Sequence, residues 1–373
     1  MPLKGRGAAA ARDLAAQEAF HTERPLLCVA TDVRHEALLC RGCLAPLGLP
    51  ADHVRAAAPE LLDCEEELRS ALEDPKAQRL CAAEGGCCGR CGARFCSGCV
   101  GAGTQATHAC AGTVALRERW PKLAAAPRFR LFVQALSLVT QVGDHAAAAA
   151  AAIDTLCRPA LPADDNAAAM AAWEAEMAEP LAVLHCALAR ERLERARPPE
   201  TAVQTSAALA LISEWCSVRG YRGFERRVAT NAHGLRFASP ASDVLVAAMA
   251  AAPSLSPAAQ EAVCWAVAGV GEETQLPFYV ATAVCAQGSA CNHSCEPSAE
   301  VLASTWPELR LRTTRALRRG EELTIAYVSR QQRSLHVAPG KEGVGAAVRA
   351  ELLERYGFVC GCELCARASD ASS

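Results

Sequence analysis

The chain has 373 residues, which is more than a single hydrophobic core usually holds, so we expect two or three structural units. A net charge of -3 excludes the strong positive field with which many proteins bind nucleic acids. The first residues lack the apolar core of a secretory signal, and the longest apolar run, residues 146–153, is too short to span a bilayer. We therefore expect a soluble protein of the cytoplasm, the nucleus or both, with no membrane partner and no direct nucleic acid binding.

The predicted elements indicate β-rich ends around a helical middle. The apolar residues 26–30 predict a strand near the N-terminus. Three stretches share a high content of Ala, Leu, Glu and Arg and predict packed helices: 129–142, 166–195 and 202–215. A further helix over 256–269 is expected to begin with Ser256 as N-cap and Pro257 at its first position. The run Leu-Thr-Ile-Ala-Tyr-Val at 323–328 predicts a second strand.

The 21 cysteines are the main functional signal. In a reducing compartment, clustered cysteines are better explained by metal ligation than by disulfides. Three Cys-x2-Cys pairs followed by one histidine and one cysteine give eight candidate ligands: Cys40, Cys43, Cys88, Cys91, Cys96, Cys99, His108 and Cys110. Eight ligands complete two tetrahedral zinc sites with no open position, and such closed sites are structural. The alternative, a set of unliganded buried thiols, is disfavoured by three such spacings in one region.

The segment Phe95-Cys96-Ser97 resembles the aromatic-Cys-Ser signature of the MYND zinc finger. The interleaved ligand order of that family implies two sets of four: Cys40, Cys43, Cys96 and Cys99 on one zinc, and Cys88, Cys91, His108 and Cys110 on the other. The sequence departs from the family by a long insertion before Cys88 and by a single residue between His108 and Cys110. An i,i+2 pair does not share a helix face, so this last pair can bind one ion only from a turn or loop. Cys87 or Cys81 could replace one of its members.

A second cluster, Cys360-x-Cys362-x2-Cys365, offers three thiolates, and Cys295 is the natural fourth ligand. Cys295 ends the motif Asn292-His293-Ser294-Cys295, which precedes Gly-Glu-Glu-Leu-Thr-Ile-Ala-Tyr at 320–327. These motifs, in this order, resemble the SET lysine methyltransferases. The similarity is greatest to the SMYD family, in which the SET domain is split by a MYND finger and ends in a cysteine-rich post-SET region.

Methyl transfer to lysine needs a neutral amine, and lysine has a pKa of about 10.4 in water. Presenting the neutral amine at pH 7 costs roughly 4 to 5 kcal/mol unless the site lowers that pKa. A dry aromatic channel lowers it, because burial disfavours the ammonium, and tyrosine hydroxyls can then orient the amine. Tyr327, Tyr356 and Phe358 fit this description. The resemblance implies that Tyr327 is the catalytic tyrosine and that Tyr356 and Phe358 line the lysine channel.

The resemblance also implies a binding site for S-adenosylmethionine. Its residues share a position in the Gly-rich opening turn or in the SET motifs: Lys4, Gly5, Arg6, Gly7, Asn231, Asn292 and His293. Two of the assigned residues have a simpler interpretation from sequence. Asn231 could occupy a turn before Gly234, and Tyr327 could be a buried aromatic residue of a strand.

These features predict an α+β fold, in which a β-rich SET domain is interrupted by a MYND-type zinc finger and a helical insert and ends in a cysteine-rich, zinc-binding post-SET tail. The expected segments are 1–39 for the N-terminal part of SET, 40–110 for the finger with its insertion, 111–255 for the helical insert and intermediate SET region, 256–330 for core SET and 331–373 for the tail.

The function implied is an S-adenosylmethionine-dependent protein-lysine N-methyltransferase with about three zinc ions, acting on lysines of histone or other proteins. The main alternative is an inactive SET-MYND scaffold that binds partner peptides through its finger. The Gly-rich turn, Asn292-His293 and Tyr327 favour the enzyme, because a scaffold would not need all three. A nucleic-acid-binding zinc protein is disfavoured, since no basic stripe with interleaved aromatic residues accompanies the cysteines.

Overall fold

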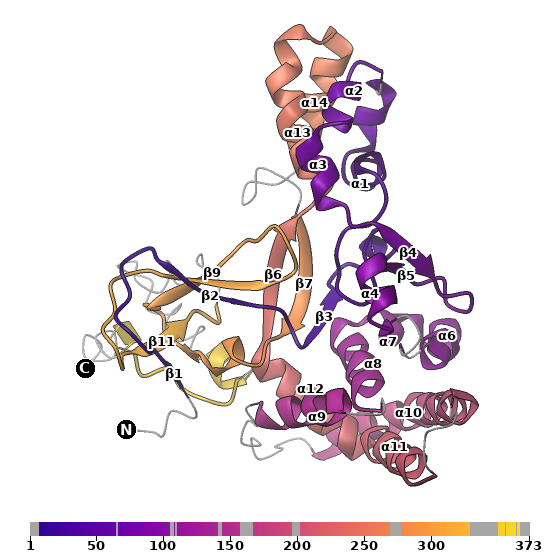
Figure 1. Cartoon of the computed structure of the whole chain (residues 1–373). Coiled ribbons are helices and arrows are strands. Elements are labelled where there is room, and N and C mark those ends of the chain that lie inside the picture. Colours follow the sequence, from indigo (N-terminus) through magenta and orange to yellow (C-terminus); the bar gives the residue numbers. More distant parts are fainter. Residues whose placement is uncertain are drawn as a thin grey trace.

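The structure is a computed structural model that describes residues 7–64, 66–104, 108, 110–140, 144–156, 167–195, 202–268, 278–328, 350–354, 356–362, 364 and 365. Within these ranges the chain forms three three-stranded sheets and one two-stranded hairpin, together with two groups of helices and a short helix beside the hairpin (Figure 1). None of the helices in this part of the chain is long and apolar enough to cross a membrane. The fold is therefore mixed helix and sheet, as the sequence predicts.

The three small sheets combine strands from both ends of the described chain. The first has the order β1 (Ala8–Ala9), β11 (Glu322–Ile325), β8 (Asn292–His293). The second has the order β2 (Ala19–Glu23), β10 (Leu309–Thr313), β9 (Ala299–Leu302). The third has the order β3 (Leu27–Ala30), β7 (Phe278–Val284), β6 (Ala232–Ala238). The pair β8 and β11 is parallel, with His293 opposite Ile325, so the two SET-like motifs lie side by side.

Strand β3 joins two hydrophobic cores. Leu27 and Val29 point into a core of helical side chains, whereas Cys28 and Ala30 belong to the core of the sheets. All four residues are buried, because both faces of the strand are covered. A strand buried on both faces is a continuous apolar run in sequence rather than an alternating one, which explains why residues 26–30 predicted it.

The predicted strand at 323–328 is only partly confirmed. Strand β11 begins at Glu322 and ends at Ile325. The backbone N–H of Tyr327 donates to Nδ1 of His293 at 3.0 Å instead of continuing a ladder. The last residues of the run were therefore predicted wrongly, because a side-chain acceptor competes for the backbone donor.

The central helices pack around aromatic side chains. They are α6 (Cys110–Arg119), α7 (Pro121–Ala125), α8 (Pro127–Val139), α9 (Asp144–Thr155), α10 (Ala167–Arg195), α11 (Ala202–Trp215) and α12 (Val218–Asn231). The helix predicted at 202–215 is confirmed, and so is the one predicted at 166–195 from Ala167 onward, since residue 166 lies outside the described part. The one predicted at 129–142 begins earlier, at Pro127, and residues 141 and 142 lie outside the described part. Phe132 is central to this group, with its ring 4.9 Å from that of Tyr221 and 5.3 Å from that of Phe224.

The insertion after Cys43 forms a separate group of helices with a segment from far along the chain. Its members are α1 (Pro50–Ala57), α2 (Arg69–Leu72), α3 (Pro75–Leu80), α13 (Pro240–Ala251) and α14 (Pro257–Ala268), which lie together at the top of Figure 1. Val54, Leu61 and Val244 are fully buried in their shared core. The predicted cap of α14 is confirmed, since Ser256 Oγ accepts from the N–H of Ala259 at 3.3 Å. Residue 269 lies outside the described part.

Short 3-10 helices connect these parts: η1 (Val33–Leu38), η2 (Pro59–Cys64), η3 (Ala252–Ser254) and η4 (Gly288–Ala290). The segment predicted to form the finger contains the hairpin β4 (Glu84–Cys87) and β5 (Arg94–Cys96) with the following helix α4 (Ser97–Gly101). Phe95 of β5 is fully buried in the finger's own small core, beside Cys40 and Leu47. The finger thus has a core of its own between the two helical groups.

Candidate active site and metal centres

The structure gathers the twelve candidate metal ligands into three groups of four. The groups are Cys40, Cys43, Cys96 and Cys99; Cys88, Cys91, His108 and Cys110; and Cys295, Cys360, Cys362 and Cys365. Within each group all four ligand atoms lie within 4.8 Å of one another. Zinc bound tetrahedrally at about 2.3 Å from sulfur separates two sulfur ligands by about 3.8 Å. The donor types and spacings fit zinc, so each group could hold one ion.

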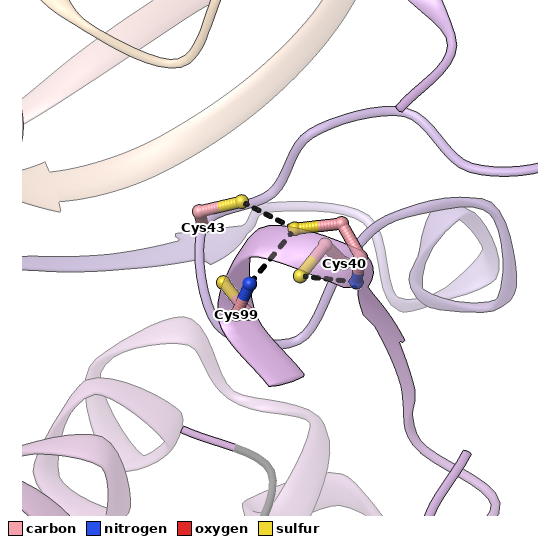
Figure 2. Close-up of side chains that lie close together, drawn as sticks. Cys40, Cys43 and Cys99 are labelled. Atoms are coloured by element: carbon pink, nitrogen blue, oxygen red, sulfur yellow. Dashed lines mark hydrogen bonds between the residues drawn. The ribbon is translucent and has the colours of Figure 1, made fainter. Parts of the chain in front are cut away.

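The first group closes the base of the finger. Figure 2 shows the sulfur atoms of Cys40, Cys43 and Cys99 turned toward a common centre. The sulfur atoms of Cys43 and Cys96 are 3.7 Å apart. The backbone N–H of Cys96 donates to Cys40 Sγ at 3.2 Å, and that of Cys99 donates to Cys96 Sγ at 3.4 Å. Such N–H···S bonds orient thiolates and offset their charge, as outer partners of metal ligands do.

In this group Cys43 donates a hydrogen bond to Cys40, which lowers the pKa of Cys40 to about 5. Burial raises the pKa of Cys99 to about 12. Four thiolates at this spacing repel one another, so only part of the group ionises unless a cation compensates the charge. A divalent ion at the centre supplies that compensation, which is a second reason why the donor set fits zinc.

The second group contains the irregular pair His108 and Cys110. His108 lies just before α6, and Cys110 is the first residue of that helix, so the pair does come from a turn, as its spacing requires. The sulfur of Cys91 is 3.3 Å from His108 Nε2, and Cys88 and Cys110 have their sulfur atoms 3.4 Å apart. The His108 ring packs against Phe95 at 5.0 Å, which fixes its orientation. Neither Cys81 nor Cys87 belongs to this group of four.

The third group joins two segments that are distant in sequence. Cys295 follows strand β8, and its sulfur is 3.9 Å from that of Cys360 and 3.7 Å from that of Cys365. Cys295, Cys360 and Cys365 are buried in a small core with Val328 and Leu352. Metal binding at this group would therefore fix the C-terminal segment onto the sheet that carries β8 and β11.

His293 links this third group to Tyr327. Its Nδ1 accepts the backbone N–H of Tyr327 at 3.0 Å, so its proton is on Nε2. Nε2 is 3.4 Å from Cys295 Sγ and donates to it. The imidazole is buried, with 6% of its surface exposed. One side chain thus bridges a metal ligand and the backbone of the predicted catalytic tyrosine.

The three predicted aromatic residues form one cluster. The rings of Tyr327 and Tyr356 are 4.8 Å apart, and Phe358 lies 6.3 Å from each of them. The hydroxyl of Tyr327 donates to the carbonyl oxygen of Cys291 at 2.7 Å. With its proton engaged in this way, the phenolic oxygen presents lone pairs, so it can act as a hydrogen-bond acceptor toward an amine. Tyr327 is half-buried and follows the end of β11, so it is not merely a core aromatic residue of the strand.

A cavity of about 310 Å³ lies next to this cluster and is lined by both tyrosines. This volume is within the range of small-molecule sites. Its lining also includes Asn231 at the end of α12, His233 in β6 and Ser289 in η4. Burial lowers the pKa of His233 to about 4, so this imidazole is neutral at pH 7. The cavity therefore combines polar groups with an aromatic wall.

Asn231 is the last residue of α12 and is 2% exposed. Its amide donates to the carbonyl of Arg227 at 2.7 Å, and its own carbonyl accepts from Ser289 Oγ at 2.7 Å. It does not occupy a turn before Gly234, because α12 runs directly into β6, which contains Gly234. That alternative is wrong. The structure places Asn231 on the cavity wall instead.

Gly7 and Asn292, which are both predicted to bind the cofactor, lie close together. The side chain of Asn292 donates to Glu322 at 2.7 Å. Gly7 lies so close that a Cβ on it would be 2.9 Å from Asn292 Nδ2 and 3.2 Å from Glu322 Oε1. Lys4, Gly5 and Arg6 lie outside the described residues. Neither Gly7 nor Asn292 is among the residues lining the 310 Å³ cavity.

Several polar partners had not been assigned a role from the sequence. Glu322 holds the amide of Asn292, Ser289 holds the carbonyl of Asn231, and the Cys291 carbonyl accepts from Tyr327. Glu322 stands inside the Gly-Glu-Glu motif and could have been noticed there. A serine hydroxyl or a backbone carbonyl has no sequence signal, because only the tertiary fold decides what it contacts.

A family model of the SET domain matches residues 5–328. The match covers most of the 373 residues, so the chain belongs to the SET domain family. Proteins with this domain are generally protein lysine methyltransferases that use S-adenosylmethionine. No curated protein matches the chain.

Proposed function

We propose that this protein is an S-adenosylmethionine-dependent protein-lysine N-methyltransferase. The observation that carries the proposal is the position of Tyr327. Its ring belongs to the aromatic cluster with Tyr356 and Phe358, and it also lines the 310 Å³ cavity. A side chain shared by an aromatic channel and a small-molecule cavity stands where an amine and a methyl donor would meet.

The aromatic cluster would prepare the substrate amine. Rings packed 4.8 to 6.3 Å apart leave few polar groups around an inserted lysine, so burial there disfavours its ammonium form. The proton leaves to solvent before transfer, and the Tyr327 oxygen then accepts an N–H of the neutral amine and orients its lone pair. Orientation of this kind accounts for a large part of the rate in reactions that need in-line attack.

The cofactor, when bound, supplies a methyl group on a positively charged sulfonium. The cavity fits such a molecule in volume and in its mixture of polar and aromatic walls. We assign its binding to Asn231, Asn292, His293 and Gly7, together with Lys4, Gly5 and Arg6, as the SET resemblance implies. Of these residues, Asn231 lines the cavity. The close approach of Gly7 to Asn292 supports this assignment, because a Cβ at position 7 would lie 2.9 Å from the amide nitrogen of Asn292 and would have to displace it.

The metal groups would be structural. All four ligands of each group are protein side chains, so no position is left for a substrate. We propose that the first two groups form a MYND-type finger within 40–110 and that the third forms a post-SET site within 331–373. The SMYD family combines a split SET domain, a MYND finger and a cysteine-rich post-SET region, and it is the subgroup we propose. Within it, the insertion in the finger and the segment Thr230-Asn231 resemble most the fifth-numbered animal member. We propose residence in the cytoplasm, the nucleus or both.

The test measures cofactor binding and transfer separately. Calorimetry with S-adenosylmethionine is expected to give saturable binding to the zinc-loaded protein. Incubation with methyl-labelled cofactor and a cell lysate should label lysines, which mass spectrometry of the labelled proteins would identify. If cofactor binds but no lysine is labelled, the inactive scaffold replaces the enzyme. If cofactor does not bind, the assignment of the cavity is wrong as well.

A further inference from the structure

A second cavity, of about 460 Å³, lies between the finger and the central helices. Its wall includes η1, the turn between β4 and β5, α6 and α7. It shares no lining residue with the cavity at Tyr327. Nothing in the proposed methyl transfer uses it, so its chemistry can be considered independently.

The charges around this cavity are unbalanced. Glu36 accepts from Arg41 at 2.5 Å, from Arg117 at 2.9 Å and from Arg130 as well. A fourth arginine, Arg94, donates to both carboxylate oxygens of Glu84. The charges of this pair cancel, so Arg94 adds no net charge to the cavity. Among the described lining residues Glu36 is the only carboxylate. Three guanidinium groups therefore share one carboxylate, an excess of two positive charges.

Arg130 is the most buried member, with 4% of its surface exposed. One end of its guanidinium donates to the backbone carbonyl of Ala30 at 2.6 Å, but Nε has no partner among the described residues. Burial lowers the pKa of Arg130 to about 10, which still leaves it charged at pH 7. A smaller, water-sized cavity reaches Arg130 and shares Arg41 and Arg117 with the larger one. A buried cation with an unpaired donor is costly unless negative charge lies near it.

The neighbouring metal group offsets only part of this excess. Cys91 of the second group lines the cavity. Three thiolates with one neutral histidine around a divalent zinc leave a single net negative charge. With zinc bound, this second group would offset one of the two positive charges and leave one among the side chains that surround the cavity.

We propose that this cavity binds an oxyanion, either a phosphate or a carboxylate, between Arg41 and Arg117. The side chains of both arginines are partly exposed, 21% and 47%, so a ligand can reach them from solvent. Guanidinium groups bind planar and tetrahedral oxyanions through paired N–H donors. Arg41 and Arg117 already bind one carboxylate in this way, that of Glu36. The volume exceeds that of one such group, which leaves room for the molecule that carries it.

The test uses inorganic phosphate in equilibrium dialysis against the zinc-loaded full chain at low ionic strength. Saturable binding is expected, and it should weaken as sodium chloride is raised, because screening reduces partly exposed ion pairs. Arg117→Ala should weaken binding by about tenfold or more, since a charge-assisted hydrogen bond is lost. Arg117→Lys should retain part of the affinity, because lysine keeps the positive charge but lacks the paired N–H donors of the guanidinium group.

Arg119→Ala is the matched control. Arg119 lies on the same helix, is exposed, pairs with Glu179 and does not line the cavity. This variant should bind phosphate within about twofold of the wild type, because exposed pairs contribute little. The unfolding midpoint of each variant establishes that it is folded. Equal weakening by Arg117→Ala and Arg119→Ala would show a diffuse charge effect and overturn the proposal, as would the lack of saturable binding.

Competition identifies the source of the oxyanion. The probes are a capped peptide of alternating Glu and Gly and the same peptide with Gln in place of Glu. If only the Glu peptide displaces phosphate, the site accepts carboxylates of an acidic protein segment. If neither peptide displaces it, the site is specific for phosphate. Both results support an oxyanion site, whereas displacement by the Gln peptide would show that charge is not what is recognised.

Discussion

Replacing Tyr327 by Phe removes one oxygen from the centre of the candidate active site. In the wild type that oxygen donates to the carbonyl of Cys291 at 2.7 Å and, in our proposal, accepts from the substrate amine. The ring would keep its contact with Tyr356, 4.8 Å away, and the backbone bond to His293 would stay. The variant therefore tests the hydroxyl rather than the packing.

Two magnitudes follow from these contacts. Losing the bond to the buried carbonyl of Cys291, which is 2% exposed, should cost about 1 to 2 kcal/mol of folding free energy. Losing the orientation of the amine should slow methyl transfer by about a hundredfold, equal to about 2.7 kcal/mol in the barrier. Cofactor affinity should change little, because the hydroxyl acts on the amine.

The assay combines calorimetric binding of S-adenosylmethionine with single-turnover transfer to the substrate found in the lysate. Tyr279→Phe is the control. Tyr279 is buried on β7, which belongs to a different sheet from β11, and its hydroxyl forms a hydrogen bond with Nδ1 of His53. It does not line the cavity at Tyr327. This control should lose similar stability but keep its transfer rate. Transfer at the wild-type rate by Tyr327→Phe would refute the role given to its hydroxyl.

Three further results are expected. Elemental analysis should find about three zinc ions per chain and about two after Cys362→Ser, and a value near zero for the wild type would contradict the metal assignment. Gly7→Ala should weaken cofactor binding by about tenfold in calorimetry, because its Cβ would lie 2.9 Å from Asn292 Nδ2, and unchanged affinity would exclude this contact from the site. In α12, Gly220→Ala should lower the free energy of unfolding in urea by about 1 to 3 kcal/mol, because its Cβ would lie 2.3 Å from a backbone carbonyl oxygen. Gly223→Ala should raise this free energy by about 0.5 to 1 kcal/mol, because no atom lies within 4 Å of its Cβ and alanine favours the helix. Equal effects of the two alanines would contradict the packing around Gly220.

The sequence alone determined those features that depend on local composition and spacing. The helices at 166–195 and 202–215 follow from runs of strong helix formers, and the cap at Ser256 follows from its dipeptide with Pro257. The candidate ligands were also evident, because a Cys-x2-Cys spacing brings two thiolates together within one turn.

The tertiary structure alone decided which distant groups meet. The insertion after Cys43 packs on α13 and α14, which follow it by about two hundred residues in the sequence. Their side chains share one hydrophobic core, which no local sequence pattern predicts. Strand β11 ends at Ile325 because His293, brought beside it by the parallel pairing with β8, accepts the N–H of Tyr327. Likewise, three arginines share Glu36 only because η1, α6 and α8 converge. Long-range contacts of this kind depend on burial and on the geometry of the whole chain, so they could not be predicted from the residues one segment at a time.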